Sequence, residues 1–128
     1  MTLRIVRLGE PRHAQEGTRI GTVRRPPRGV RKSRYAADDW FDVWYPDIAP
    51  SAGLMTQGQV AATEPEWKRF VRAFKAEMNV PTARRTLDLL AVLSHGSNLS
   101  IGCYCENEAR CHRSVLRELL MKRGASLA

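Results

Sequence analysis

Long apolar runs are missing from this sequence, and cysteine is scarce. No stretch approaches the roughly 18 apolar residues that a membrane-spanning helix needs. The opening residues, MTLRIVRLGE, are too short and too charged for a secretory signal, so a cytoplasmic protein without a membrane partner is expected. Only three cysteines occur, an odd number that argues against a disulfide framework, and cytosolic thiols are kept reduced.

Acidic residues are also few, which leaves the chain strongly positive. Asp and Glu number 13 against 21 Lys and Arg, for a formal net charge of +8 at pH 7. The segment 19–34 has no acid and seven basic residues: Arg19, Arg24, Arg25, Arg28, Arg31, Lys32 and Arg34. Because Pro26, Pro27 and Gly29 prevent regular structure, these groups are expected on a constrained loop. Such a loop favours an anionic partner, either nucleic acid or a phosphorylated small molecule, although a solvated basic loop has the same composition.

The apolar pattern changes period along the chain. Alternation typical of strands occurs at residues 3–8, 19–23 and 99–105. Spacing typical of helices occurs at residues 63–78, 81–96 and 111–124. With 128 residues, we expect one domain spanning 1–128. Its predicted class is α/β, with three layers around a small, largely parallel sheet.

Two segments between the strands and helices are harder to interpret. Residues 38–50 hold four of the nine aromatic residues, and a short helix is expected from Asp38 or Asp39 to just before Pro46. In this segment Trp44 or Tyr45 either lines a cleft beside the cysteines or belongs to a hydrophobic wall. Residues 51–62 are small and Gly-rich, which predicts a mobile segment that could serve as a lid.

All three cysteines fall within the segment CYCENEARCHR, at the predicted join between the last strand and the last helix. One interpretation is a metal site for zinc or ferrous iron, with Cys103, Cys105 and Cys111 as thiolate ligands and His112 or Glu106 as the fourth ligand. The neighbours Cys111 and His112 argue against it, because consecutive helical residues point about 100° apart.

The second interpretation is thiol chemistry. Cys105 or Cys111 would be the nucleophile, favoured by the start of a helix and by nearby Arg113. His112 would carry the proton, and Glu106 would orient it or act as an acid or base. Arg113 would also bind the anionic group of a substrate.

Four segments together resemble a known family. CYCENEARCHRSVLRELL, GTRIGTVRRPPRGVRKSRYA, FDVWYPDIAPSAGL and EPEWKRFVRAFKAEM occur in the order found in the bacterial and archaeal domain-of-unknown-function 488 family (YeaO-like). The chain resembles a branch with a CYCxxxxxCHR signature, and the similarity covers residues 17–124. The resemblance implies an α/β fold and marks Arg28 as a candidate anion-binding residue, with Arg25 and Lys32 as weaker companions.

Three functions remain open from the sequence. The first is a small enzyme or metal-binding protein that acts on an anionic substrate, such as a nucleotide or nucleic acid. The second is a non-enzymatic module that binds nucleic acid through the loop 19–34. The third is a metal sensor or store.

Overall fold

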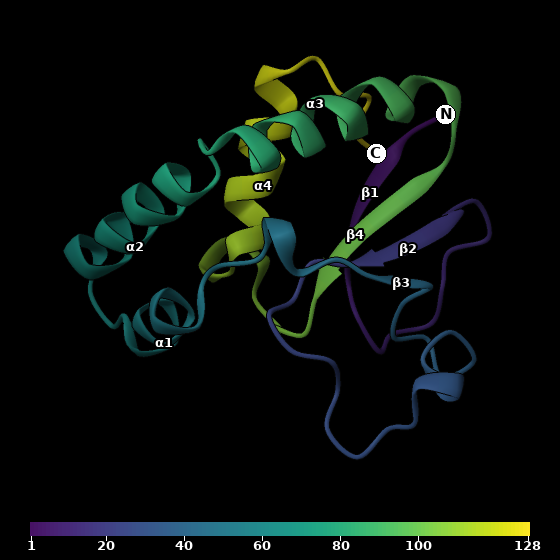
Figure 1. The fold of residues 1–128 in the computed structure, drawn as a ribbon, viewed down its shortest axis with the longest axis horizontal. Coiled ribbons are helices and arrows are strands. Elements are labelled where there is room, and N and C mark those ends of the chain that lie inside the picture. The colour runs from purple at the N-terminus through teal and green to yellow at the C-terminus, as the bar shows by residue number, and fades with distance from the viewer.

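A four-stranded parallel sheet forms the centre of the molecule. The computed structural model describes residues 1–128. The strands are β1 (Leu3–Arg7), β2 (Thr18–Gly21), β3 (Val43–Trp44) and β4 (Leu99–Cys103). They lie in the order β1-β4-β2-β3, and every pair is parallel (Figure 1). The predicted α/β class with a small parallel sheet is therefore confirmed, and the arrangement is compatible with a three-layer domain.

Strand β4 is central because it pairs with β1 on one side and with β2 on the other. All five of its residues are buried, and Ile101 is opposite both Ile5 and Ile20. Gly102 has no Cβ, and this lets the side chain of Leu8 approach the strand closely, because a Cβ at this position would lie 2.6 Å from that side chain. The strand ends at Cys103, two residues before the predicted end. There β1 ends as well, and β2 ends one residue earlier, opposite Gly102.

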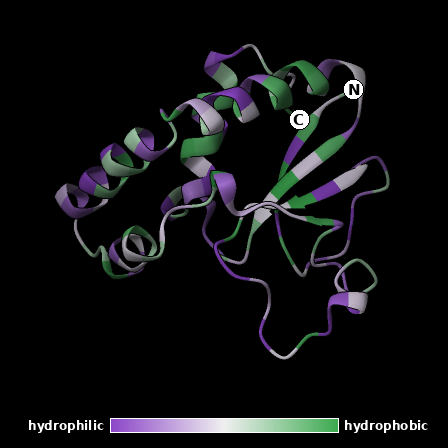
Figure 2. Ribbon diagram, viewed as in Figure 1, coloured by the Kyte–Doolittle hydropathy of each residue, from purple (hydrophilic) through white to green (hydrophobic).

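Four α-helices complete the fold, and three of them follow the predicted ranges closely. They are α1 (Ala52–Val60), α2 (Glu64–Glu77), α3 (Pro81–Gly96) and α4 (His112–Lys122). Thr63 caps α2 by accepting a hydrogen bond from the backbone N–H of Glu66, as the capping box predicts. In Figure 2, hydrophilic and hydrophobic residues alternate along α2, as expected for a helix with one buried face.

The main core joins these helices to the sheet. Its 15 buried residues include Phe74 of α2, Leu87 of α3 and Leu116 of α4, packed with Leu3 and Ile101 of the strands. A second cluster of five buried residues lies at the carboxyl ends of the strands and consists of Leu8, Val23, Phe41, Cys103 and Cys111. Two of the three cysteines therefore belong to this smaller cluster.

One local prediction was wrong, and a second segment contains a helix that its composition did not indicate. Residues 40–45 are not helical: Asp39 has a left-handed backbone with φ 62°, and Val43–Trp44 pairs with β2 as an edge strand. The backbone N–H of Asp42 donates to the carbonyl of Arg19, which holds this segment extended. Residues 51–62, predicted to be a mobile segment that could serve as a lid, contain helix α1, which packs against Phe70 of α2 at Gly58. The lid role stays a prediction.

None of the helices combines the length and apolarity needed to cross a membrane.

Candidate metal centre and its cleft

The three cysteines converge at the carboxyl edge of the sheet. Cys103 ends β4, Cys105 follows in the connecting loop, and Cys111 is the residue that precedes α4. After β4 the chain makes a 3-10 turn at Glu108–Arg110 and returns, which carries Cys111 back toward the strand end. The sulfur atoms of Cys103 and Cys105 lie 3.7 Å apart, and all three thiols are free.

The backbone of Cys111 removes the geometric objection to joint use of Cys111 and His112. Cys111 is extended, with φ −128° and ψ 153°, and the helix begins only at His112. The 100° separation of consecutive helical side chains therefore does not apply to this pair. The sulfur of Cys111 lies 3.7 Å from Nδ1 of His112, so the sequence-based expectation that both could not easily reach one ion was wrong.

Hydrogen bonding fixes which nitrogen of His112 faces the sulfurs. Nε2 lies 2.7 Å from the backbone carbonyl of Thr22, and a carbonyl can only accept, so Nε2 carries the proton. In the neutral ring Nδ1 then has a free lone pair directed toward Cys111. A metal-binding histidine commonly donates its other N–H to a carbonyl in this way, which fixes the ring and the tautomer. Phe74 packs edge-on against the ring, with centroids 5.6 Å apart.

The sulfur cluster favours a thiolate at Cys111. Hydrogen bonds from the thiols of Cys103 and Cys105 hold the pKa of Cys111 well below its usual value in spite of burial. The pKa of Cys103 is raised, because its proton is held between the other two sulfurs and because it is buried. The pKa of Cys105 is also raised. Its contact with Cys103 alone would lower that pKa, but its bond to Cys111 and its burial outweigh this.

The donor atoms suit a tetrahedral metal ion. The ligand atoms of Cys103, Cys111 and His112 all lie within 4.8 Å of one another, and all three residues are buried. Metal–sulfur bonds of about 2.3 Å in a tetrahedral site place sulfur ligands about 3.8 Å apart. A small contraction would therefore bring all three onto one ion. Cys105 lies outside this compact group, although its sulfur is near that of Cys103.

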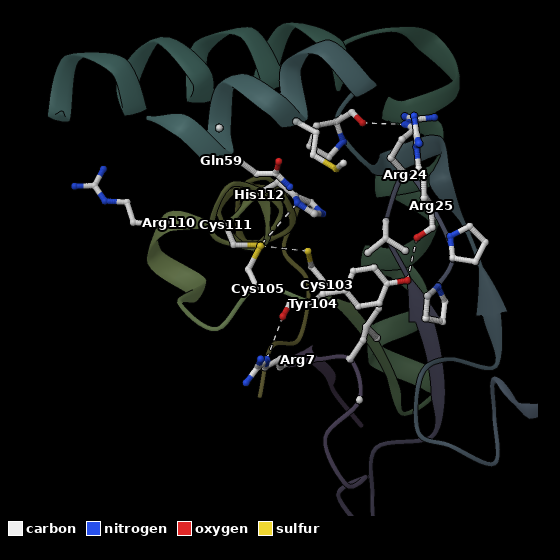
Figure 3. A pocket seen from close by; sticks show the side chains of 18 of the residues that line it. Arg7, Arg24, Arg25, Gln59, Cys103, Tyr104, Cys105, Arg110, Cys111 and His112 are labelled. Atoms are coloured by element: carbon white, nitrogen blue, oxygen red, sulfur yellow. Dashed lines mark hydrogen bonds between the residues drawn. The ribbon is translucent and has the colours of Figure 1, made fainter. Parts of the chain in front are cut away.

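A large cleft opens over the cluster. Its volume is about 1190 Å³, and Cys103, Cys105, Cys111 and His112 are among its lining residues (Figure 3). Five arginines and one acid line it, namely Arg7, Arg24, Arg25, Arg28, Arg110 and Glu10. Its aromatic lining consists of Trp40, Trp67, Phe70 and Tyr104. The thiols and imidazole therefore share a rim with cationic and aromatic groups.

Comparison with known proteins places the chain in a family. A family model described as the active DUF488-N3 subclade matches residues 3–124. The chain belongs to the DUF488 family. This confirms the resemblance seen over residues 17–124, and the clustered cysteines and His112 of this DUF488 protein are consistent with its Cys/His signature. No curated protein and no solved structure matches the chain.

The basic loop of this DUF488 chain divides into structural and free arginines. Arg19 is buried and paired with Glu16, with Nε 2.6 Å from the carboxylate. Arg24 donates to the backbone carbonyls of Pro46, Ala49 and Pro50, at 2.9 to 3.1 Å. Arg25 and Arg28 are exposed, have no side-chain partner and line the cleft. Lys32 lies in the exposed 3-10 turn Lys32–Arg34 and is not part of the cleft lining.

Two predicted residues after β4 lie to one side of the cluster. Arg113 is buried, and its guanidinium donates to the carbonyls of Val6 and Cys105 and to the sulfur of Cys111, the last at 3.4 Å. Glu106 is 85% exposed and faces Arg7 at 3.7 Å. Both line a smaller cavity of about 380 Å³ rather than the main cleft. Their predicted roles in anion binding and proton transfer stay predictions.

The aromatic lining differs from the one that the sequence suggested. Trp44 donates its indole N–H to the carbonyl of Val23 at 2.8 Å, and the hydroxyl of Tyr45 lies 3.0 Å from that of Thr86. Neither residue is among those that line the cleft; Trp40 and Tyr104 are. Trp40 is in the aromatic-rich segment 38–50, and Tyr104 and Arg110 are in the cysteine segment, whereas nothing in the local sequence marks Arg7 as a cleft residue.

Proposed function

We propose that this protein binds one zinc or ferrous ion through Cys103, Cys111 and His112 and acts on an anionic substrate in the adjoining cleft. One observation carries the proposal: the lone pair on Nδ1 of His112, oriented by the carbonyl of Thr22, converges with two sulfurs at the edge of a cleft rich in arginine. Soft sulfur with imidazole is a donor set that suits either of these metals.

The fourth coordination position decides what the metal can do. Because Cys105 lies outside the compact three-ligand group and is only half-buried, we favour a site with one position open toward the cleft. An open position on a bound metal ion supplies a Lewis acid, or a water with a lowered pKa, for attack on a substrate. If Cys105 coordinates instead, the ion is closed off and the site is structural.

Burial favours metal binding over a free thiol nucleophile. Cys111 is the sulfur most stabilised as a thiolate, but it is only 2% exposed. A nucleophile must reach its substrate, whereas a ligand needs only its ion. Cys105 is more accessible, but its pKa is raised, which disfavours the reactive thiolate. A cytoplasmic location, which remains a prediction, would keep all three thiols reduced and ready to bind metal.

Metal content tests the proposal directly. Protein purified without a metal-chelating tag should contain close to one equivalent of zinc or iron by elemental analysis. Replacement with cobalt should give thiolate-to-cobalt charge-transfer absorption.

His112→Gln should weaken metal affinity by more than the roughly 10- to 100-fold typical of losing an outer-shell partner. The matched control is His95→Gln, because His95 is exposed and bonded only to the carbonyl of Gly124. Wild-type protein without bound metal that also fails to take up cobalt would contradict the proposal.

One observation supports the alternative of a non-enzymatic nucleic-acid-binding module: Arg25 and Arg28 are exposed and unpaired on the basic loop. In that case affinity for nucleic acid should fall steeply with salt, and Cys111→Ser should leave it unchanged. An enzyme that uses the Cys/His cluster should lose activity in the same variant.

A further inference from the structure

The cleft has an excess of positive charge, and part of it is unpaired. Five arginines line it against the single acid Glu10. Arg7 pairs with Glu10 and Glu106, and Arg110 pairs with Glu64, at surface positions where an incoming anion can compete. Arg25 and Arg28 are exposed and have no hydrogen-bond acceptor within the protein. Their guanidinium groups are therefore free to bind an anion from solution.

These charges are spread around the cysteines and do not converge on one point. In Figure 3, Arg110 and Arg25 lie on opposite sides of the cysteine cluster, and Arg7 lies on a third side. The three residues come from segments far apart in the chain: the end of β1, the loop after β2 and the turn before α4. A compact anion needs a compact nest of donors, whereas a chain of phosphates is matched by positive charge distributed along a groove.

An aromatic pair lies next to the unpaired arginines. Trp40 and Tyr104 are both half-buried cleft residues and pack edge-to-face, with centroids 5.8 Å apart. The hydroxyl of Tyr104 donates to the backbone carbonyl of Arg25 at 2.9 Å, which ties the aromatic pair to the basic loop. Gly9 leaves room for the indole, because a Cβ at that position would lie 2.8 Å from Trp40. Half-exposed aromatic rings beside basic groups are typical surfaces for stacking unpaired bases.

We propose that the cleft binds single-stranded nucleic acid. The phosphates would follow Arg25 and Arg28 across the cluster toward Arg110, with one base on the Trp40–Tyr104 pair. A duplex is disfavoured, because its bases keep their faces inside their own stack and offer none to the aromatic pair. A bound strand would also bring one nucleotide over the metal centre, a step that rests on the proposed function.

The chain offers matched pairs of variants for the test. Arg28 lines the cleft, whereas Arg31 is also exposed, lies three residues further on and is not part of the lining. Trp40 lines the cleft, whereas Trp44 is 43% exposed and lies outside it. Affinity for a fluorescent single-stranded oligonucleotide would be measured by anisotropy over a range of salt concentrations. A duplex of the same sequence and a nucleoside monophosphate would serve as competitors.

The wild-type protein should bind the single strand more tightly than either competitor. Arg28→Ala should weaken binding about tenfold at low salt and reduce the slope of log K against log salt by about 0.7, whereas Arg31→Ala should change affinity less than about twofold. Trp40→Leu should weaken binding roughly fivefold or more, and Trp44→Leu should not.

Equal effects of Arg28→Ala and Arg31→Ala would show diffuse charge attraction and would overturn the inference. Equal effects of Trp40→Leu and Trp44→Leu would show that no base stacks on the Trp40–Tyr104 pair and would also overturn it. Preference for the duplex or for the monophosphate would also overturn it. Metal content, measured on the same wild-type sample, keeps the two proposals separate. Strand binding by a protein that lacks metal and takes up no cobalt would support the cleft inference and contradict the metal site, and a metal-loaded protein that binds no strand would do the reverse.

Discussion

Arg113 is placed to position the cluster. Its three guanidinium nitrogens donate to the carbonyls of Val6 and Cys105 and to the sulfur of Cys111. The side chain therefore links the end of β1, the cysteine loop and the start of α4. Lysine has one ammonium group on a flexible stem and cannot reproduce three bonds in a planar fork.

Arg113→Lys should lower the free energy of unfolding by about 2 kcal/mol, because one ammonium group cannot reach all three buried acceptors that the guanidinium satisfies. It should also speed alkylation of Cys105, since the loop loses its restraint. Urea denaturation and mass spectrometry of iodoacetamide-treated protein would measure the two effects, at equal metal content. The control is Arg117→Lys, on the same helix: Arg117 pairs with Glu108 at the surface, so its loss should cost less than about 1 kcal/mol. Unchanged alkylation of Cys105 in Arg113→Lys would contradict the positioning role.

At the residue scale, the sequence predicted which residues form the candidate site better than it predicted how they are arranged. Density of soft ligands in one short segment was enough to select Cys103, Cys105, Cys111 and His112. Their mutual directions depend on one backbone conformation, the extended state of Cys111, which residue spacing does not encode. The partner that orients His112 is the carbonyl of Thr22, a backbone group present at every position, so no side-chain pattern could have identified it.

Among the elements, helix α1 depends on a single close contact. Leu54 is its only fully buried side chain, and the helix forms one side of the cleft through Met55, Gly58 and Gln59. Gly58 lies against Phe70 of α2 so closely that a Cβ would be 2.7 Å from the ring. Glycine is therefore needed here for close approach, at the cost of helix propensity.

Gly58→Ala should destabilise the protein by about 1 to 3 kcal/mol, because the methyl group forces α1 away from α2. Gly53→Ala, in the same helix with nothing within 4 Å of the added Cβ, should instead stabilise it by up to about 1 kcal/mol. Thermal and urea denaturation of both variants would measure these shifts. Stabilisation by both substitutions would show that helix propensity, and not the contact with Phe70, governs this helix.

The same contrast explains which elements could be predicted. Helix α2 buries Trp67, Phe70 and Phe74 on one face and has a capping residue, so its period and its start are both visible in the sequence. Helix α1 has a single buried residue and therefore no period to detect. The two-residue strand β3 exists because it pairs with β2, a tertiary contact, and local aromatic content therefore suggested the wrong structure there.

For the molecule as a whole, a buried ion pair ties the sheet to the segment that precedes β2. Glu16 accepts hydrogen bonds from Arg19 at 2.6 and 2.8 Å and from Ser100 of β4 at 3.0 Å. Arg19 also donates to the backbone carbonyls of Glu10 and Asp39, so every part of the pair is satisfied. Burial alone would raise the pKa of Glu16, but the hydrogen bonds from Arg19 and Ser100 outweigh it and place the pKa below the usual value.

This pair should make the fold sensitive to acid. Above the pKa of an unfolded glutamate, about 4.3, the carboxylate is charged in both states and its contribution to stability is complete. As the pH falls through the lower folded-state pKa, the folded protein must take up a proton and that contribution is lost. Glu16→Gln should therefore cost about 3 to 5 kcal/mol near neutral pH, because Arg19 is left buried without its partner.

The difference between wild type and Glu16→Gln should shrink as the pH is lowered below about 4, since acid removes the same charge from the wild type. Urea denaturation across this range would follow the free energy of unfolding of both proteins. Asp47→Asn is the control, because Asp47 is exposed and belongs to no ion pair. A difference that stays constant with pH would mean that Glu16 stabilises the fold by packing, and that its charge contributes nothing.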